Sequence, residues 1–317
     1  MSTLNPKMQA LVELFAEAKG FPEMTAPEAR EASEAGIPLA GDGPAVDSVE
    51  EIEIPTGHGH HVGARVYRPT ADEPTTVVIW FHGGGWVIGS PKADDAICRT
   101  IAAESGALVV NADYRHAPEE PFPAATDDAF AVLRWVDEHL AGGRPIVLSG
   151  SSAGANLATV SALRAKEADG PAVALQVLIY PVTDHDFETP SYVEFAAQPP
   201  LGRGEMEWFW GHYVPDVADR DHPYASPLKA EDLSGLPPAY LTVAGADPLY
   251  SEGLAYADAL KAAGVEVTVR EDADVTHGYV NFLAAVDTGN EVLTEIAALI
   301  RAIPATPRGA SGEPAQI

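Results

Sequence analysis

The sequence predicts an α/β domain in which a mostly parallel, eight-stranded sheet carries helices on both faces. Short β-branched runs alternate with amphipathic helical runs along most of the chain, which is typical of doubly wound sheets. No internal repeat stands out, and 317 residues, 46% of them hydrophobic, are enough to bury a large core. We therefore expect one principal domain with a minor appendage.

The expected strands are runs of β-branched or aromatic residues with turn-forming residues on either side. They cover residues 52–54, 62–67, 76–81, 107–111, 146–149, 175–180, 239–243 and 266–270. The first two flank a Gly-rich turn and are expected to pair antiparallel, whereas the other six need crossover connections. Expected helices cover residues 93–104, 124–139, 153–168, 251–263 and 290–302, and Pro304 stops the last one.

Two segments do not follow this alternation. Residues 1–45 hold helical patterns at 8–18 and 26–35, and residues 184–225 are rich in aromatic and loop residues. We expect both to form a helical cap over the C-terminal edge of the sheet, where open α/β sheets bind ligands. The alternative is a peripheral helical pack with no role in binding. The main domain then comprises residues 46–183 and 226–303, and the Pro- and Gly-rich tail, 304–317, is expected to be disordered.

Composition excludes several classes of partner. The net charge of −28, from 47 acidic and 19 basic residues, disfavours nucleic acid and anionic membrane surfaces as partners. No apolar run approaches the roughly 20 residues that span a bilayer, and the N-terminus lacks a signal-peptide pattern, so we expect a soluble, cytoplasmic protein. The single cysteine, Cys98, has no second thiol for a disulfide or metal site and is expected to be a small apolar helix residue.

Residues 150–154 read Gly-Ser-Ser-Ala-Gly, a GxSxG pattern between an apolar strand and an Ala- and Leu-rich helix. Small residues at Gly150 and Gly154 allow a sharp turn that exposes the Ser152 hydroxyl, and the following helix N-terminus favours negative charge. In this context we expect Ser152 to be a nucleophile. A tight connection without chemistry is the alternative.

Residues 82–86 read His-Gly-Gly-Gly-Trp and directly follow a buried strand. Successive glycines expose backbone N–H groups, and each preorganised donor to the oxyanion of acyl transfer contributes about 3 to 4 kcal/mol. We assign an oxyanion hole to Gly84 and Gly85, with Gly83 as the less favoured partner, and to the N–H of Ala153. A phosphate-binding loop would also need a following GK[ST] pattern, and none follows.

A serine hydroxyl needs a base, and the base needs a third group that fixes its tautomer. Asp247 follows the strand at 239–243 and His277 follows the strand at 266–270, in the order serine, acid, histidine that α/β hydrolases share. We therefore expect Ser152, His277 and Asp247 to form a catalytic triad. The competing histidines and acids are His185, His212, His222, Asp184, Asp272 and Asp274.

These motifs resemble the hormone-sensitive-lipase-like family of α/β hydrolases, the bacterial family IV esterases, over nearly the whole chain. Residues 82–86 resemble the family's HGGG loop, and residues 150–155 resemble its GDSAGG turn. Four further segments are similar to the DYRLAPE, DPLxDEG and HGF motifs and to the stretch before the acid-bearing strand: residues 113–119, 247–253, 277–279 and 219–228.

The resemblance implies an α/β-hydrolase fold with a helical cap, the triad named above, no cofactor and carboxylesterase activity on short acyl chains. Three residues depart from the family pattern: Ser151 stands where Asp is frequent, His116 replaces Leu, and Ser251 replaces Asp. None of them removes a group that makes or breaks a bond, so we expect altered hydrogen bonding and the same mechanism. His116 is expected to be a solvated or core histidine.

The expected ligand is a small ester, with nitrophenyl and other aryl esters preferred over long-chain triglycerides. Its binding residues are expected to be Trp86, Ser151, Phe195, Trp208 and Phe209. Amide or peptide hydrolysis by the same triad and a non-catalytic ligand receptor are the alternatives, and a homodimer is left open. The histidines of residues 57–61 lack a nearby carboxylate or cysteine, so we expect a solvent-facing turn and no metal site there.

Overall fold

The computed structural model describes residues 4–57, 59–70 and 73–305 and contains the eight-stranded sheet that the sequence predicts. In space the strands follow the order β1-β2-β4-β3-β5-β6-β7-β8. The β1–β2 and β2–β4 pairs are antiparallel and every other neighbouring pair is parallel, so the expected pairing of the first two strands is confirmed. The strands are β1 (Ser48–Gly57), β2 (His60–Arg68), β3 (Val77–Phe81), β4 (Leu108–Ala112), β5 (Ile146–Ser151), β6 (Val173–Ile179), β7 (Ala239–Ala246) and β8 (Val267–Thr276).

Helices separate the strands from β3 onward, and others precede or interrupt the sheet. The α-helices are α1 (Pro6–Ala16), α2 (Ala26–Ala35), α3 (Asp95–Ser105), α4 (Ala124–Val136), α5 (Ala153–Glu167), α6 (Pro190–Glu194), α7 (Arg203–Tyr213), α8 (Tyr250–Ala262) and α9 (Asp287–Ala302). A π-helical turn, η3 (Asp137–Ala141), extends α4. The 3₁₀ turns are η1 (Phe21–Glu23), η2 (Ile37–Ala40), η4 (Val217–Asp221), η5 (Pro227–Lys229) and η6 (Tyr279–Asn281).

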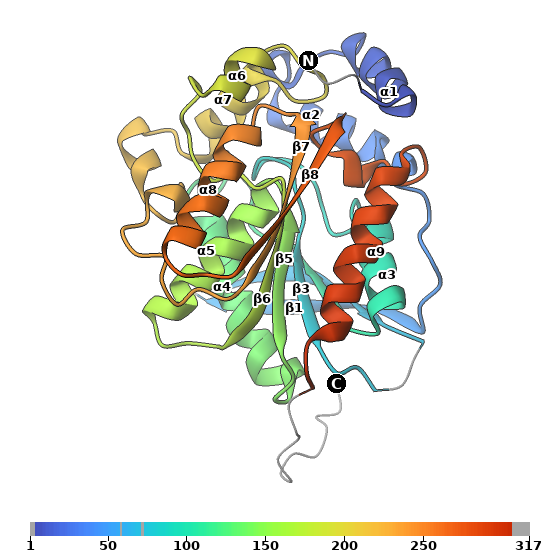
Figure 1. Cartoon of the computed structure of the whole chain (residues 1–317), viewed down its shortest axis with the longest axis vertical. Coiled ribbons are helices and arrows are strands. Elements are labelled where there is room, and N and C mark those ends of the chain that lie inside the picture. The colour runs from blue at the N-terminus through green and yellow to red at the C-terminus, as the bar shows by residue number, and fades with distance from the viewer. Residues whose placement is uncertain (1–3, 58, 71–72, 306–317) are drawn as a thin grey trace.

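Two groups of helices cover the two faces of the sheet (Figure 1). Side chains alternate along a strand, and on β3 Ile79 and Phe81 join the core cluster that contains α4, α5 and α8. Val78 and Trp80 join the opposite cluster, which contains α3, α9 and part of α1. Because both faces are covered, the central strands are buried along their whole length, as their continuous apolar runs predict.

The last strand differs most from the sequence prediction. β8 continues to Thr276, whereas the sequence analysis ends this strand at residue 270. Residues 271–274, three of which are acidic, are unfavourable strand formers, but the pairing with β7 extends to Ala246 opposite Thr276. Arg270 also donates a 2.9 Å hydrogen bond to the buried Asp272. As a result, His277 directly follows the strand.

The N-terminal helices and the insert between β6 and β7 gather at one end of the sheet (Figure 1). Phe21 packs against Trp208 and Phe209 of α7, with ring centroids 6.0 and 5.5 Å apart. Further toward the N-terminus, the Asn5 amide N–H donates a 2.9 Å hydrogen bond to the carbonyl of Asp274 on β8. The Phe21 contacts join the two segments that the sequence analysis assigns to a cap, and the Asn5 hydrogen bond joins the first of them to the sheet.

Arg30 of α2 fixes the N-terminal helices to the loops that follow β3 and β4. Its Nε and one terminal nitrogen each donate a 2.9 Å hydrogen bond, to the carbonyls of Val87 and Ala117 respectively. The guanidinium also makes a two-point ion pair with Glu119, at 2.8 and 2.5 Å. One side chain therefore connects α2 to both loops.

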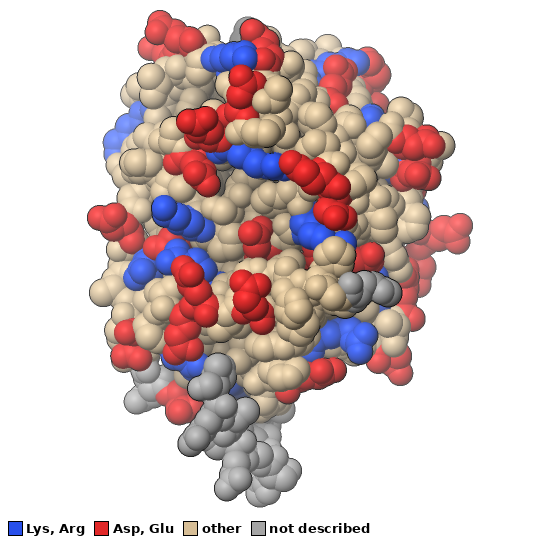
Figure 2. Space-filling model, turned by 180° about the vertical axis from the view of Figure 1, so that it is seen from behind, with Lys and Arg blue, Asp and Glu red and all other residues tan. Residues whose placement is uncertain are grey.

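Acidic side chains are spread over the face shown in Figure 2, and the Lys and Arg side chains lie among them rather than in one patch. Among the described residues, no helix combines the length and the apolar content that crossing a membrane needs. Most of the expected disordered tail, residues 306–317, lies outside the described part of the chain, as does His58.

Candidate active site

Ser152 lies in the sharp turn between β5 and α5, with φ 55° and ψ −120°. Such a conformation is strained for a side chain other than glycine, and it persists only where the surroundings enforce it. A Cβ on Gly150 would lie 2.6 Å from the carbonyl oxygen of Phe81, and a Cβ on Gly154 would collide with the same oxygen. Both glycines are therefore required by close packing against the end of β3.

His277 and Asp247 converge on this serine from the ends of two neighbouring strands. The Nε2 atom of His277 lies 2.9 Å from Ser152 Oγ, and its Nδ1 atom lies 2.7 Å from Asp247 Oδ2. Asp247 is fully buried, and its other oxygen accepts a 2.9 Å hydrogen bond from the Leu249 N–H. The three predicted residues thus lie in one hydrogen-bonded line, although 125 positions separate the serine from the histidine.

The glycine loop after β3 borders the same serine. Gly83, Gly84 and Gly85 all line the cavity that contains Ser152, and Gly84 and Gly85 have φ of +117° and +57°. Within the described residues, no acceptor is found for the N–H groups of Gly84 and Gly85. Ala153 is the first residue of α5, where a backbone N–H has no partner inside the helix. Donors are therefore available on both sides of the serine.

The cavity at Ser152 has a volume of about 180 Å³ and is mostly apolar. A second cavity of about 670 Å³ adjoins it under α1, α2 and the insert. The two cavities share the lining residues Phe21, Ser33, Ala93, Pro200 and Asn281.

Of the five residues that were expected to bind substrate, two line the cavity at Ser152 and three do not. Ser151 and Phe209 line the cavity at Ser152. Trp86, Phe195 and Trp208 line neither cavity. Trp86 has a left-handed φ of 59°, which directs its ring into the core, where it stacks on Tyr213 with centroids 3.9 Å apart. Trp208 packs against Phe21 and His212, and Phe195 directly follows the short helix α6.

Several residues that line the cavity were missed by the sequence analysis. Tyr180 packs its ring 4.5 Å from that of His277. Asp94, 2% exposed, accepts hydrogen bonds from Trp80 Nε1 (2.7 Å) and Asn281 Nδ2 (3.0 Å). Burial raises the pKa of Asp94 above its ordinary value. The only sequence signals were a tyrosine at a predicted strand end and an acid in the first turn of a predicted helix, and neither is specific.

The competing residues have other partners. Asp184 forms a 2.9 Å ion pair with Lys229, and Asp272 pairs with Arg270. His185, His212 and His222 do not line the cavity at Ser152. Cys98 is buried in α3, as expected of a small apolar residue.

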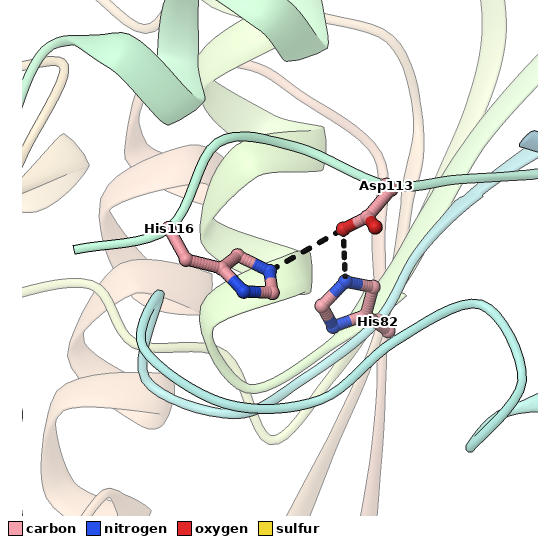
Figure 3. Close-up of side chains that lie close together, drawn as sticks. All are labelled: His82, Asp113 and His116. Atoms are coloured by element: carbon pink, nitrogen blue, oxygen red, sulfur yellow. Dashed lines mark hydrogen bonds and ion pairs between the residues drawn. The ribbon is translucent and has the colours of Figure 1, made fainter. Parts of the chain in front are cut away.

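Three side chains near the glycine loop have the composition of a metal-ligand set, and sequence reasoning missed them as a group. They are His82, Asp113 and His116 (Figure 3). His60 and His61 are the first two residues of β2 and are exposed, so the structure places them at the end of the hairpin turn and partly corrects the expectation of a turn.

Comparisons with known proteins agree with this geometry. Residues 78–281 match a family model described as the alpha/beta hydrolase fold. Carboxylesterase NlhH of Mycobacterium tuberculosis is 42% identical over 253 residues, which are 77% of this chain and 79% of that protein. Ethyl acetate hydrolase of Pseudomonas putida is 32% identical over 309 residues, covering 93% and 97% of the two chains.

Among solved structures, a hyperthermophilic esterase from the archaeon Pyrobaculum calidifontis superposes with a TM-score of 0.89 and 39% identity. The match covers 95% of this chain and 99% of that one, so it includes the cap segments as well as the sheet. Fold, motif order and sequence identity lead to the same conclusion: this chain belongs to the hormone-sensitive-lipase-like family of α/β hydrolases.

Proposed function

We propose that this carboxylesterase hydrolyses short-chain acyl esters through Ser152, His277 and Asp247, by way of an acyl-enzyme. The observation that carries the proposal is the hydrogen-bonded line from Asp247 Oδ2 through the imidazole to Ser152 Oγ, at 2.7 and 2.9 Å. Nucleophile, base and orienting acid are arranged in this way in serine hydrolases of unrelated folds.

In the proposed cycle, His277 Nε2 takes the proton of Ser152 as Oγ attacks the ester carbonyl carbon. The tetrahedral intermediate then collapses, the carbon–oxygen bond to the alcohol breaks, and His277 returns the proton to the departing oxygen. Water, deprotonated by the same imidazole, attacks the acyl carbon. The bond from this carbon to Ser152 Oγ then breaks, the imidazole returns the proton to Oγ, and the acid leaves. Buried Asp247 holds the imidazole with Nε2 toward the serine and stabilises its positive charge in both half-reactions.

The negative charge on the carbonyl oxygen would be held by backbone N–H groups of Gly84, Gly85 and Ala153. Gly83 is the less favoured donor. Support comes from the position of these residues around Ser152 and from the left-handed φ values that turn the loop toward the cavity. Each such donor contributes about 3 kcal/mol to transition-state stabilisation in enzymes where it has been removed.

We infer that residues 1–45 and 184–225 act together as the cap and limit the size of the substrate. The cavity at the nucleophile is small, about 180 Å³, and Phe21, Met206 and Phe209 contribute side chains from both segments to its wall. A short acyl chain fits this space, and the larger adjoining cavity gives room for the alcohol. The name of the Pseudomonas relative, an ethyl acetate hydrolase, is consistent with a small ester.

The test is hydrolysis of a p-nitrophenyl ester series from acetate to palmitate by the wild-type protein and by Ser152→Ala. We expect turnover to be greatest for the shortest chains and to be lost in Ser152→Ala with the fold retained. Ser161→Ala, on the buried side of the same helix α5, is the matched control and should keep its activity. Absence of turnover by folded wild-type protein would contradict the proposal. Faster hydrolysis of anilides than of esters would favour amide hydrolysis instead.

A further inference from the structure

The proposed mechanism does not use three side chains that lie around the start of the glycine loop (Figure 3). His82 follows β3 and is fully buried, Asp113 follows β4, and His116 lies three residues further on. The Nε2 atom of His82 lies 3.1 Å from Asp113 Oδ1, and the Nε2 atom of His116 lies 3.3 Å from the same oxygen. Two imidazole nitrogens thus converge on one carboxylate oxygen.

The hydrogen bonds of His82 restrict which atom occupies the space between the ring and Asp113. Its Nδ1 atom lies 2.7 Å from the carbonyl oxygen of Gly83, which only accepts, so Nδ1 carries a hydrogen. A neutral imidazole has one N–H, so Nε2 then presents a lone pair to the carboxylate oxygen, another acceptor. The contact is stable only with a cation between or beside the two atoms, either a proton on Nε2 or a metal ion.

His116 favours the metal ion over the proton. Its Nε2 atom is buried and close to Asp113 Oδ1, but it makes no well-aligned hydrogen bond with any described residue. With a proton on His82, this second nitrogen is left with only a poorly aligned contact to Asp113 Oδ1, whereas a metal ion takes both nitrogens and the carboxylate oxygen as ligands.

The two nitrogen-to-oxygen distances fit a tetrahedral site. Bonds of about 2.0–2.1 Å from zinc to nitrogen and oxygen place neighbouring ligand atoms about 3.3 Å apart. The observed separations are 3.1 and 3.3 Å, and all three ligand atoms lie within 4.8 Å of one another. The outer contacts are also those of metal ligands: His82 Nδ1–H donates to a backbone carbonyl, and Asp113 Oδ1 accepts a 2.8 Å hydrogen bond from the Tyr114 N–H.

We propose that His82, Asp113 and His116 bind a divalent transition-metal ion of the zinc class, with water as the fourth ligand. Two imidazoles and one carboxylate suit zinc, whereas calcium and magnesium prefer sites made entirely of oxygen atoms. The ion can enter from solvent, because the side chains of Asp113 and His116 are 36% and 18% exposed.

The bound ion would join the loop after β3 to the loop after β4, immediately before Gly83. Its role is therefore structural: it holds the glycine loop in place and takes no part in bond making. This inference does not depend on the proposed ester hydrolysis.

The test is titration of chelator-stripped, full-length protein with Zn²⁺ in competition with a chromophoric chelator. Wild type should bind one ion per chain, and His116→Leu should lose this binding while circular dichroism shows the same fold. Asp113→Asn is the second variant. His61→Leu, which removes an exposed histidine at the start of β2, and Ser152→Ala should both bind as wild type does, so the zinc site and the esterase mechanism are tested separately.

Substitution with Co²⁺ gives a readout on the wild type alone, because a tetrahedral site with nitrogen ligands gives intense visible absorption. The proposal is overturned if folded wild type binds no Zn²⁺, since a proton then occupies the position. It is also overturned if binding survives in both His116→Leu and Asp113→Asn, or if it disappears in His61→Leu.

Discussion

Replacing Arg30 with Met should destabilise the protein and lower its esterase activity more than replacing Glu119 with Gln. Arg30 makes two kinds of contact, an ion pair with Glu119 and hydrogen bonds to the carbonyls of Val87 and Ala117. Met keeps most of the aliphatic volume of the side chain and removes both the ion pair and the two hydrogen bonds. Glu119→Gln removes only the charge of the pair.

The magnitudes differ because the two kinds of contact differ in exposure. The Glu119 side chain is 57% exposed, and ion pairs of this kind contribute about 0.2–1 kcal/mol. A hydrogen bond from a charged donor contributes about 1.5–3 kcal/mol. At the lower end, chosen because Arg30 is 30% exposed, its two bonds to carbonyls contribute about 3 kcal/mol. We therefore expect Arg30→Met to cost about 3–4 kcal/mol and Glu119→Gln less than about 1 kcal/mol.

Urea unfolding at neutral pH measures both costs, and kcat/KM for p-nitrophenyl acetate reports whether the glycine loop has shifted. Arg30→Lys is the matched control, because it keeps the charge but not the planar fork, and it should fall between the two. Equal losses of stability in Arg30→Met and Glu119→Gln would refute the reasoning, since the ion pair would then account for the whole effect.

The ion pair between Arg30 and Glu119 makes the stability of the folded protein depend on pH. Its hydrogen bond with Arg30 lowers the pKa of Glu119 from the ordinary 4.5 to about 2. The folded-state pKa is depressed, so the contribution of the pair to stability is complete above about pH 4.5 and is lost as the pH falls toward 2. The difference in stability between wild type and Glu119→Gln should therefore shrink over this range, and a constant difference would contradict the assignment.

Three further changes test the site. Gly85→Ala should lower kcat, because the left-handed φ disfavours alanine and because the new Cβ would overlap the Phe209 ring. Adding Phe209→Ala removes only the overlap, so it should restore only part of the lost kcat. Full restoration of kcat would exclude backbone strain as a cause. Asp247→Asn should lower kcat by a factor of about 10⁴, the size of the effect of the equivalent change in a serine protease triad. Urea unfolding of the variant checks that the fold is retained. A loss of kcat below tenfold would remove Asp247 from the triad. Burial raises the pKa of Glu252 well above its ordinary 4.5, so the contribution of the protonated carboxyl group to stability is lost as the pH rises above that value. Glu252→Gln should therefore become more stable relative to wild type as the pH rises, and an unchanged difference would contradict this.

The sequence was sufficient to predict the sheet and the candidate triad because both depend on strong local patterns. Continuous apolar runs mark the buried strands, and the glycines around Ser152 mark a turn that only small residues permit. Asp247 and His277 were identified by their order along the chain and their position after strands. The length of β8 was not predictable in the same way, because its acidic end is held by pairing with β7 and by Arg270.

The lining of the cavity was less predictable, because side-chain direction depends on backbone conformation that residue types do not reveal. Trp86 adjoins the glycine loop in sequence, yet its left-handed φ turns the ring into the core. The grouping of His82 with His116 depends on two loops that different strands bring together, and neither loop has a recognisable ligand spacing of its own.

The proposed cap draws its two halves from distant parts of the chain, and this has a consequence for biosynthesis. Asn5 pairs with Asp274, 269 positions later, and Phe21 packs against Trp208. On the ribosome, the first helices emerge long before any of their neighbours exist, and contacts of such long range form late in folding. The wall of the cavity around Ser152 is therefore assembled late, and a nascent chain would leave Ser152 open to water until β8 has been synthesised.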